Sequence, residues 1–339
     1  MTVFVTGGAG YIGTHVLLEL VDKGYDVVVA DNFVNSRPEA ISRVRELSGR
    51  DFPFYEMDVR DAALLDRVFC ENKIDCVIHL AGLKAVGESV IMPLEYFSNN
   101  LDSTLALCGA MKRHNVSNFI FSSSATVYNA DNDMPLTEES VTGGCTNPYG
   151  WTKFMCEQIL RDVSNASEKW AVALLRYFNP IGAHPSGRIG EDPQDVPNNL
   201  MPYIAQTAVG RLPFLNVYGD DYDTPDGTGV RDYIHVADVA AGHVSAIKYL
   251  ETHPGVSVFN LGTGKGVSVL ELVSAFEKAA GVSIPKKIVG RRQGDLSVCY
   301  AATDKAKREL GWESKKTIAE ACADAWRWQS QNPYGYADN

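Results

Sequence analysis

Short apolar runs alternate with longer amphipathic segments over the first 180 residues of the chain. The apolar runs predict strands at Val3–Thr6, Val27–Asp31, Phe52–Glu56, Cys76–Leu80, Phe119–Ser123 and Ala171–Arg176. The segments between them predict helices at His15–Lys23, Glu39–Leu47, Ala62–Cys70, Thr104–His114 and Tyr149–Val163, and Ser36-Arg37-Pro38-Glu39 and Asp61 are typical of helix starts. Strands that alternate with helices build βαβ units, so this half predicts an α/β fold with a doubly wound parallel sheet.

The pattern changes after Pro180. Residues 180–233 are rich in Pro, Gly, Asn and Asp and have little periodicity, which predicts long loops that face a ligand. A strand at Ser257–Leu261 and helices at Leu270–Ala280 and Ile318–Gln329 follow. We therefore expect one domain at 1–180 and a smaller α/β domain at 181–339, with some segments of the second half returning to the first domain.

Composition excludes several classes of protein. Lys and Arg number 31 against 42 Asp and Glu, and the net charge of −11 argues against broad binding to nucleic acid or to an anionic membrane. The N-terminus predicts a strand rather than a signal peptide, and no apolar run approaches the ~18 residues of a membrane span. The seven cysteines are never spaced C-x-x-C, so we expect free thiols and a cytoplasmic protein. The histidines show no metal-binding spacing, so no metal site is expected.

A glycine-rich turn follows the first predicted strand and leads directly into a helix. Gly8, Gly10 and Gly13 match the pattern G-x-G-x-x-G. With Gly7 as its first residue, the turn also matches the related G-x-x-G-x-x-G. Such glycines let backbone N–H groups approach a pyrophosphate at the N-terminus of a helix, so the turn predicts a dinucleotide site.

An acidic residue ends the second predicted strand. Asp31 lies 18 residues after Gly13, where a carboxylate binds the adenine ribose and would repel a 2′-phosphate, so NAD is favoured over NADP. The loops at Asp58-Val59 and Leu80–Lys84 are expected to face the same cofactor, because ligands of open α/β sheets lie at the carboxyl ends of the strands. The sheet is therefore predicted to be of Rossmann type. The alternative is a structural turn beside a solvated Asp31.

Candidate catalytic groups follow the fifth predicted strand, which ends in Ser122, Ser123 and Ser124. Tyr149 and Lys153 are spaced i, i+4 and lie on one helix face. A nearby ammonium favours the phenolate and lowers the pKa of a tyrosine. A tyrosine that acts as a base near neutrality needs a fall of about three units from ~10, or some 4 kcal/mol, which two close cations in a water-poor site can supply. Without the glycine turn, the Tyr-x-x-x-Lys pair could arise by chance.

Together these motifs resemble the extended short-chain dehydrogenase/reductase superfamily, which combines G-x-x-G-x-x-G, a serine and Y-x-x-x-K. Further segments narrow the resemblance to the UDP-glucose 4-epimerase family, namely Leu80–Ser89, Ser122–Tyr128, Leu175–Pro180, Pro197–Tyr203 and Asp226–Val236. The resemblance runs from residue 1 to about residue 335. Asn129 replaces a usual glycine and Trp151 lies inside the Y-x-x-x-K helix, but neither departure removes a catalytic group.

The resemblance implies an NAD-dependent isomerase that works through a transient 4-keto sugar, with NAD bound by 1–180 and the UDP-sugar by 181–339. Tyr149, with Ser124, would take the proton of the sugar 4-hydroxyl, and Lys153 would hold the nicotinamide ribose and lower the pKa of Tyr149. The residues that it implies at NAD are Gly7, Gly10, Tyr11, Ile12, Gly13, Asp31, Asn32, Asn35, Ser36, Asp58, Val59, Leu80, Ala81, Gly82, Lys84, Asn99, Ser122, Tyr149, Lys153 and Phe178.

The resemblance implies that most contacts to a UDP-sugar come from the second half of the chain. Arg231 and Arg292 would pair with the diphosphate, because guanidinium groups bind phosphate oxygens bidentately. Asp295 would bind the uridine ribose. The other implied contacts are Lys84, Ser124, Tyr149, Asn179, Asn199, Leu200, Asn216, Val217, Tyr218, Tyr233 and Cys299. A homodimer built by helices of the first domain is also implied.

Cys299 bears on which sugars are accepted. In family members that resemble strict glucose/galactose epimerases, a tyrosine stands at this position and crowds an N-acetyl group. Cysteine is smaller, so we expect activity on the UDP-glucose/UDP-galactose pair and also on the UDP-N-acetylglucosamine/UDP-N-acetylgalactosamine pair. The alternative is that Cys299 is only a small buried apolar residue.

Three other functions fit parts of the sequence. A nucleotide-sugar 4,6-dehydratase shares the fold but would need an acidic pair where Ala125-Thr126 stand. A 4-epimerase of uronic-acid or pentose nucleotide sugars would use the same motifs. A non-catalytic NAD-binding sensor would not need Ser124, Tyr149 and Lys153 together.

Overall fold

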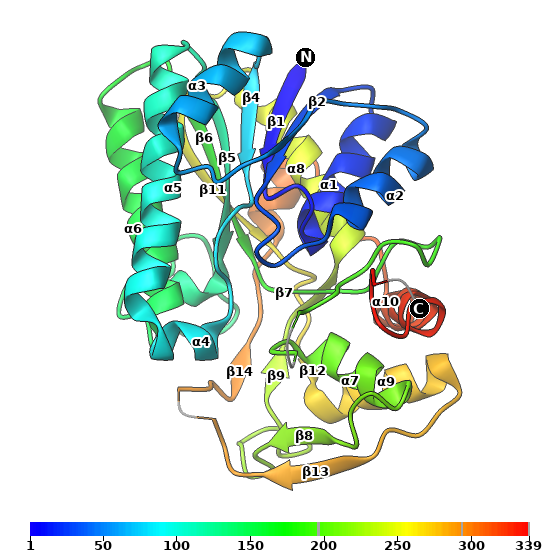
Figure 1. Ribbon diagram of the computed structural model, residues 1–339. Coiled ribbons are helices and arrows are strands. Elements are labelled where there is room, and N and C mark those ends of the chain that lie inside the picture. Colours follow the sequence, from blue (N-terminus) through cyan, green and yellow to red (C-terminus); the bar gives the residue numbers. More distant parts are fainter. Residues whose placement is uncertain (195–196, 293, 338–339) are drawn as a thin grey trace.

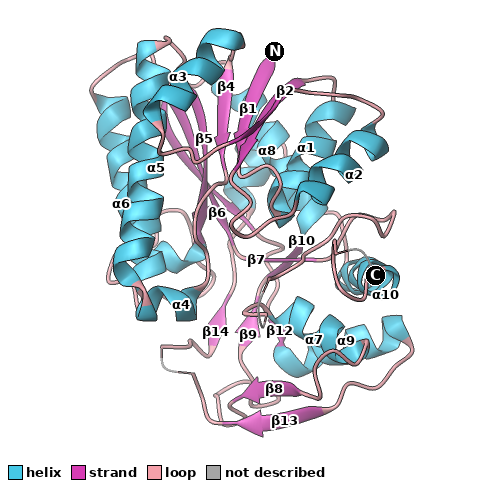
Figure 2. Cartoon of the chain, viewed as in Figure 1, coloured by secondary structure: helices cyan, strands magenta, loops and turns pink. Residues whose placement is uncertain are grey.

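The computed structural model describes residues 1–194, 197–292 and 294–337. Its main sheet has seven parallel strands in the order β11-β6-β5-β4-β1-β2-β3 (Figures 1 and 2). These strands are β1 (Thr2–Thr6), β2 (Asp26–Asp31), β3 (Phe54–Glu56), β4 (Cys76–His79), β5 (Asn118–Ser124), β6 (Ala171–Tyr177) and β11 (Gly255–Leu261).

Helices cover both faces of this sheet, which explains why its strands are apolar on both sides. Val3 and Val5 pack into one buried cluster, and Phe4 packs into the cluster on the opposite face. The helices of the first face are α1 (Tyr11–Asp22), α2 (Pro38–Ser48) and α8 (Val236–Leu250). Those of the second face are α3 (Ala62–Glu71), α5 (Pro93–Arg113) and α6 (Pro148–Asn165), with the short α4 (Val86–Ile91) packed against α5 and α6 (Figure 2).

The order of the strands creates a reversal beside β1. The chain passes outward from β1 to β2 and β3, and it then returns to β4 on the other side of β1. The carboxyl ends of β1 and β4 therefore border the crevice where open α/β sheets bind ligands. Two segments from beyond residue 180, α8 and β11, belong to this part of the molecule.

The remaining elements form a second lobe, in the lower part of Figure 1. Its helices are α7 (Leu200–Ala208), α9 (Val269–Ala280) and α10 (Ile318–Gln331), which share one buried cluster. Its strands pair as β7 (Asn179–Ile181) with β10 (Tyr233–His235), β8 (Leu215–Tyr218) with β13 (Lys286–Val289), and β9 (Val230–Arg231) with β12 (Val267–Ser268) and β14 (Val298–Cys299). A 3₁₀ turn at Ala125–Val127 and a π-helical turn at Ala306–Leu310 complete the described elements.

Most predicted elements are confirmed, with the seven strands of the main sheet correct to within two residues at each end. Asp61 is confirmed as a helix cap, because its carboxylate accepts hydrogen bonds from the first turn of α3. The helix start at Ser36-Arg37-Pro38-Glu39 is also confirmed, because α2 begins at Pro38 with Arg37 as its N-cap, and Ser36 binds Asp31. The prediction of loops over 180–233 is wrong at α7, whose apolar residues are buried.

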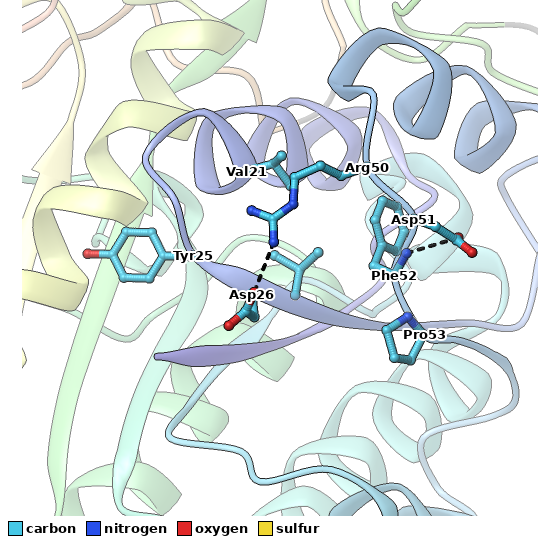
Figure 3. Close-up of a pocket in the computed structure, with 8 residues that line it drawn as sticks. Val21, Tyr25, Asp26, Arg50, Asp51, Phe52 and Pro53 are labelled. Atoms are coloured by element: carbon cyan, nitrogen blue, oxygen red, sulfur yellow. Dashed lines mark hydrogen bonds and ion pairs between the residues drawn. The ribbon is translucent and has the colours of Figure 1, made fainter.

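A surface pocket of about 90 Å³ lies away from the crevice, near the amino end of β2. At this pocket Arg50 pairs with Asp26 at 2.9 Å (Figure 3). It is at the end of the strand opposite the glycine turn, so it is not the predicted ligand site.

No helix among the described residues is long and apolar enough to cross a bilayer.

Candidate functional site

The glycine turn connects the carboxyl end of β1 to the first turn of α1. Gly7 has a φ of 71°, and a Cβ on it would lie 2.5 Å from the backbone nitrogen of Ala81, in the turn after β4. A Cβ on Gly13 would lie 2.3 Å from the carbonyl oxygen of Gly7. Gly10 is the N-cap of α1, and no side chain of the described residues caps it. The amide groups of this first turn are therefore suited to an anion such as a pyrophosphate.

Asp31 is held in place at the carboxyl end of β2. Its Oδ1 accepts hydrogen bonds from the backbone N of Phe33 at 2.9 Å and from Ser36 Oγ at 2.7 Å. Its Oδ2 accepts one from the backbone N of Ala9, in the glycine turn, at 2.9 Å. A carboxylate offers about four acceptor positions, so the oriented Asp31 has capacity for a ribose hydroxyl.

The loop after β3 meets the loop after β2 at the same edge of the sheet. Asp58 accepts a hydrogen bond from Arg60 Nη2 at 2.6 Å, which lowers the pKa of Asp58, and Asn32 lowers it further. Val59 is buried, whereas Asn35 is exposed. Of these residues, Asp58 and Asn32 are therefore the ones brought together.

Asn100 is a polar residue of this edge that the sequence did not single out; Asn99 was predicted instead. Asn100 Oδ1 accepts a hydrogen bond from the backbone N of Leu83 at 2.8 Å, and its Nδ2 donates to Thr152 Oγ1 at 2.9 Å. It thereby ties the turn after β4 to α6. The sequence did contain a signal for Asn100. Tyr96 and Asn100 are four residues apart and lie on the buried face of α5, whereas Asn99 is only half-buried.

Glu191 is a second residue that sequence reasoning missed. Its Oε1 accepts from Lys84 Nζ at 3.0 Å and from Asn199 Nδ2 at 2.9 Å. The carboxylate of Glu191 thus connects two predicted ligand contacts. Lys84, after β4, was predicted to contact both cofactor and substrate, and Asn199, at the start of α7, was predicted to contact the substrate. Only the spatial arrangement of these loops could reveal this pairing.

The predicted catalytic groups come together at the end of β5. Lys153 Nζ donates a hydrogen bond to the carbonyl oxygen of Ser122 at 2.7 Å and lies 5.9 Å from the ring centre of Tyr149. A Cβ on Gly82 would lie 4.0 Å from the same Nζ, so the lysine also adjoins the turn after β4. Ser124 lies beside Tyr149 and lowers the pKa of its phenol. The carboxyl ends of β4 and β5 therefore meet the first two turns of α6.

Burial dominates the electrostatics of this group. It raises the pKa of Tyr149 to about 12, against the opposing effect of the Ser124 hydroxyl. It lowers the pKa of Lys153 to about 8, because the ammonium is removed from water. Lys153 still carries its charge at neutral pH, but formation of the phenolate at Tyr149 needs additional positive charge in the site.

The predicted substrate residues of the second lobe form two groups. Arg231 Nη2 lies 3.6 Å from Asp295 Oδ1. The guanidinium of Arg292 lies 4.0 Å from the ring centre of Tyr218, the last residue of β8. Each arginine is therefore oriented by a second predicted substrate residue.

Cys299 lies between the second lobe and the catalytic groups. It pairs in register with Arg231 in the small β9–β14 ladder, and its side chain packs against a buried cluster that includes Val127, Phe178 and Ala301. Burial raises the pKa of its thiol, so Cys299 is a small apolar residue here.

The remaining predicted site residues lie on the edges and strands already described. Val217 and Tyr233 have buried side chains, so Val217 can offer a ligand only its backbone. The others are Tyr11 and Ile12 in α1, Leu80 after β4, Asn179 in β7, Leu200 in α7 and Asn216 in β8. Among the described ranges, no group of three or more His, Cys, Asp and Glu side chains is placed to hold a metal ion.

A family model described as "NAD dependent epimerase/dehydratase family" matches residues 3–262, and the chain belongs to this family. UDP-glucose 4-epimerase of Bacillus subtilis (strain 168) is 58% identical over 336 residues, which is 99% of each chain. The crystal structure of UDP-glucose 4-epimerase from Bifidobacterium longum in complex with NAD⁺ and UDP is 58% identical, with a TM-score of 0.96 over 99% of this chain and 100% of that one.

Within this family, the chain is one of the UDP-glucose 4-epimerases, NAD-dependent isomerases that interconvert UDP-glucose and UDP-galactose. The resemblance found in the sequence and the Rossmann-type fold are thereby confirmed. The UDP-Glc/GlcNAc 4-epimerase of Campylobacter jejuni is also similar, at 35% identity and a TM-score of 0.85 over 97% of this chain and 99% of that one.

We predict that Gly13→Ala weakens NAD binding by about 100-fold, or roughly 2.7 kcal/mol. The added Cβ would lie 2.3 Å from the Gly7 carbonyl oxygen, so the backbone of the turn must move. Titration of the purified protein with NAD measures the change. Gly87→Ala is the matched control, because Gly87 is exposed in α4 and its Cβ would meet no atom within 4 Å. Equal NAD affinity of Gly13→Ala and wild type would contradict the assignment of this turn.

Proposed function

We propose that this chain epimerises carbon 4 of UDP-hexoses with Tyr149 as the proton-transferring group, and that it accepts N-acetylated hexoses in addition to glucose and galactose. The observation that carries the first proposal is the position of the half-buried Tyr149 next to the buried Lys153 at the end of β5. The second rests on the small side chain of Cys299 and on the similarity to the UDP-Glc/GlcNAc 4-epimerase of Campylobacter jejuni.

The residues at the crevice fit NAD. The uncapped start of α1 would receive the pyrophosphate, and the glycines allow its close approach. Asp31 would accept a hydroxyl of the adenine ribose. Asp58 with Asn32 lies where the adenine would extend, and Lys153 lies beside the turn after β4, where the nicotinamide ribose would bind.

When bound, NAD⁺ supplies the acceptor for the hydride of carbon 4 and returns that hydride to the opposite face of the sugar. Tyr149 Oη would take the proton of the 4-hydroxyl as the hydride leaves, which gives the 4-keto sugar. The same proton would return from Tyr149 when carbon 4 is reduced again, so no net oxidation occurs. Ser124 would orient the phenol and the 4-hydroxyl, and charged Lys153 would favour the phenolate.

The second lobe would bind the UDP portion. Arg231 and Arg292 would hold the diphosphate, and Asp295, paired with Arg231, would bind the uridine ribose. Backbone and side-chain groups of β8 would contact the uracil. We accordingly propose that residues 1–180, with α8 and β11, form the NAD-binding domain and that the rest of 181–339 forms the UDP-sugar domain.

We also propose that the protein is a cytoplasmic homodimer. Apolar side chains are exposed on α4, α5 and α6, with Ile91 and Leu94 81% and 79% exposed and Leu105 and Met155 exposed on the same layer of helices. Exposed apolar groups that gather on neighbouring elements are typical of an interface. The cysteines are free, which supports a reducing compartment.

We predict that Tyr149→Phe lowers kcat for UDP-galactose by about 10²- to 10⁴-fold, the usual contribution of a general acid–base group. The change removes one hydroxyl and little volume, so bound NAD should be retained. Conversion to UDP-glucose and the NAD content of the protein are measured together. Tyr55→Phe, which removes a hydroxyl from β3, is the control and should keep its activity. Activity of Tyr149→Phe within a few-fold of wild type would exclude Tyr149 as the acid–base group.

We predict that Cys299→Tyr abolishes the reaction of UDP-N-acetylgalactosamine and spares that of UDP-galactose, because the ring would fill the space needed by the acetamido group. Product analysis with the two substrates side by side measures the preference. Cys299→Ser keeps the small volume and should keep both reactions. A wild-type protein inert toward UDP-N-acetylgalactosamine would refute the broader specificity.

We predict that the double variant Leu94→Glu, Leu105→Glu sediments as a monomer, whereas the wild type sediments as a dimer. Each new carboxylate would have to be buried without a partner at the proposed interface. Analytical ultracentrifugation measures the mass of both. Ile288→Glu, at an exposed apolar residue of β13 in the second lobe, is the control and should remain dimeric. A monomeric wild type would rule out the interface.

A further inference from the structure

A buried ion pair links α6 to β6 beyond the catalytic groups. Arg176 Nε and Nη2 donate to the two carboxylate oxygens of Glu157 at 2.9 and 2.7 Å. Both side chains are 1% exposed. Neither residue belongs to the predicted cofactor or substrate set, so the established reaction gives this pair no role.

The pair has further partners on neighbouring elements. Ser123 Oγ donates to Glu157 Oε1 at 2.5 Å, and the Arg176 guanidinium lies 4.6 Å from the ring centre of Tyr128. Tyr128 in turn donates to Asn260 Oδ1, in β11, at 2.6 Å. The network therefore joins α6 to three strands of the main sheet, β5, β6 and β11.

Successive residues of β5 contact successive turns of α6. Three consecutive serines of β5 each contact a different residue on one face of α6. The carbonyl oxygen of Ser122 accepts a hydrogen bond from Lys153, Ser123 Oγ donates one to Glu157, and Ser124 lies beside Tyr149, whose pKa it lowers. Because Tyr149, Lys153 and Glu157 are spaced by four residues, a rotation or slide of α6 that moved one would move all three.

Stability alone does not account for this network. A buried ion pair seldom stabilises a fold more than apolar residues of the same size, since both charges lose their hydration. An apolar contact also tolerates small shifts, whereas a bidentate guanidinium–carboxylate pair fixes distance and angle. The arrangement therefore suits the task of holding a helix at one defined position.

We propose that Glu157 and Arg176 are positioning residues, which fix α6 on β5 and β6 so that Tyr149 faces Ser124 and Lys153 reaches Ser122. This proposal rests on the function assigned to Tyr149 above. Loss of the pair would let α6 shift and would move Tyr149 away from Ser124. Since Ser124 lowers the pKa of the phenol, the shifted tyrosine would ionise at higher pH.

The direction in which the pH of Tyr149 ionisation moves distinguishes a positioning role from a direct charge effect. Lys153 faces it from α6, Tyr96 from α5 and Tyr177 from β6. Replacing Glu157 by Gln removes a negative charge from the region, and that effect by itself would favour the phenolate and lower the pH of ionisation. A rise in this pH therefore separates positioning from a direct charge effect.

The test measures kcat for UDP-galactose against pH with NAD-loaded enzyme. For Glu157→Gln we expect the acidic limb of the profile to move up by about one pH unit, so that kcat falls about tenfold at pH 7 and recovers at higher pH. Ser123→Ala, which deletes a single hydroxyl, should move the limb in the same direction by less. Leu160→Ala is the control, because it removes a fully buried side chain of α6 outside the network and should lower the melting temperature without moving the limb.

Each result decides the matter. An upward shift in Glu157→Gln or, if that variant does not fold, in Ser123→Ala supports the proposal. An unshifted or downward limb in the variants that fold overturns it, as does an equal shift in Leu160→Ala. If wild type lacks epimerase activity, or Tyr149→Phe keeps it, the proposed function fails, and this outcome is distinct from failure of the positioning role.

Discussion

The close approach of two backbone turns, after β1 and after β4, is the constraint on which the site depends. Gly7 and Ala81 lie so near that a single added carbon would overlap the backbone of the neighbouring turn. This contact exists because β1 and β4 are adjacent parallel strands at the point where the strand order reverses. It leaves backbone amides, rather than side chains, to line the centre of the crevice, and the polar side chains are arranged around them.

The proposed catalytic group brings together side chains that no single segment of the chain contains. The serines end β5, Tyr149 and Lys153 begin α6, and Asn100 on α5 connects α6 to the turn after β4. Burial at this junction works against both charged forms, since it raises the pKa of Tyr149 and lowers that of Lys153. Burial thus disfavours both the phenolate and the ammonium. A positively charged neighbour in the correct position would favour the phenolate and lower the pKa of the phenol.

The sequence predicts the sheet and the glycine turn well because both depend on local patterns. Apolar strands covered on both faces read as continuous hydrophobic runs, and the glycines mark a turn that excludes side chains. The start of α5 was placed at Thr104 rather than Pro93, and α7 was missed, because partly polar helical faces and a Pro- and Asn-rich context hide the period. Glu191 and the Glu157–Arg176 pair were missed for another reason. Their partners are distant in the sequence, and only tertiary packing brings them together.

Several of the polar groups proposed to bind the ligands already have partners within the protein, and this reduces the affinity that each of them can add when a ligand binds. Lys84 and Asn199 bind Glu191, and Arg231 lies against Asp295. A diphosphate that reached Lys84 or Arg231 would exchange one anionic partner of the cation for another, so each contact adds only the difference between the two. The gain in affinity must therefore come from groups with unused capacity, such as the amides at the start of α1 and the second oxygen of Asp31. In this protein the backbone of the glycine turn, fixed by the sheet, is better suited to provide that affinity than the more numerous charged side chains around it.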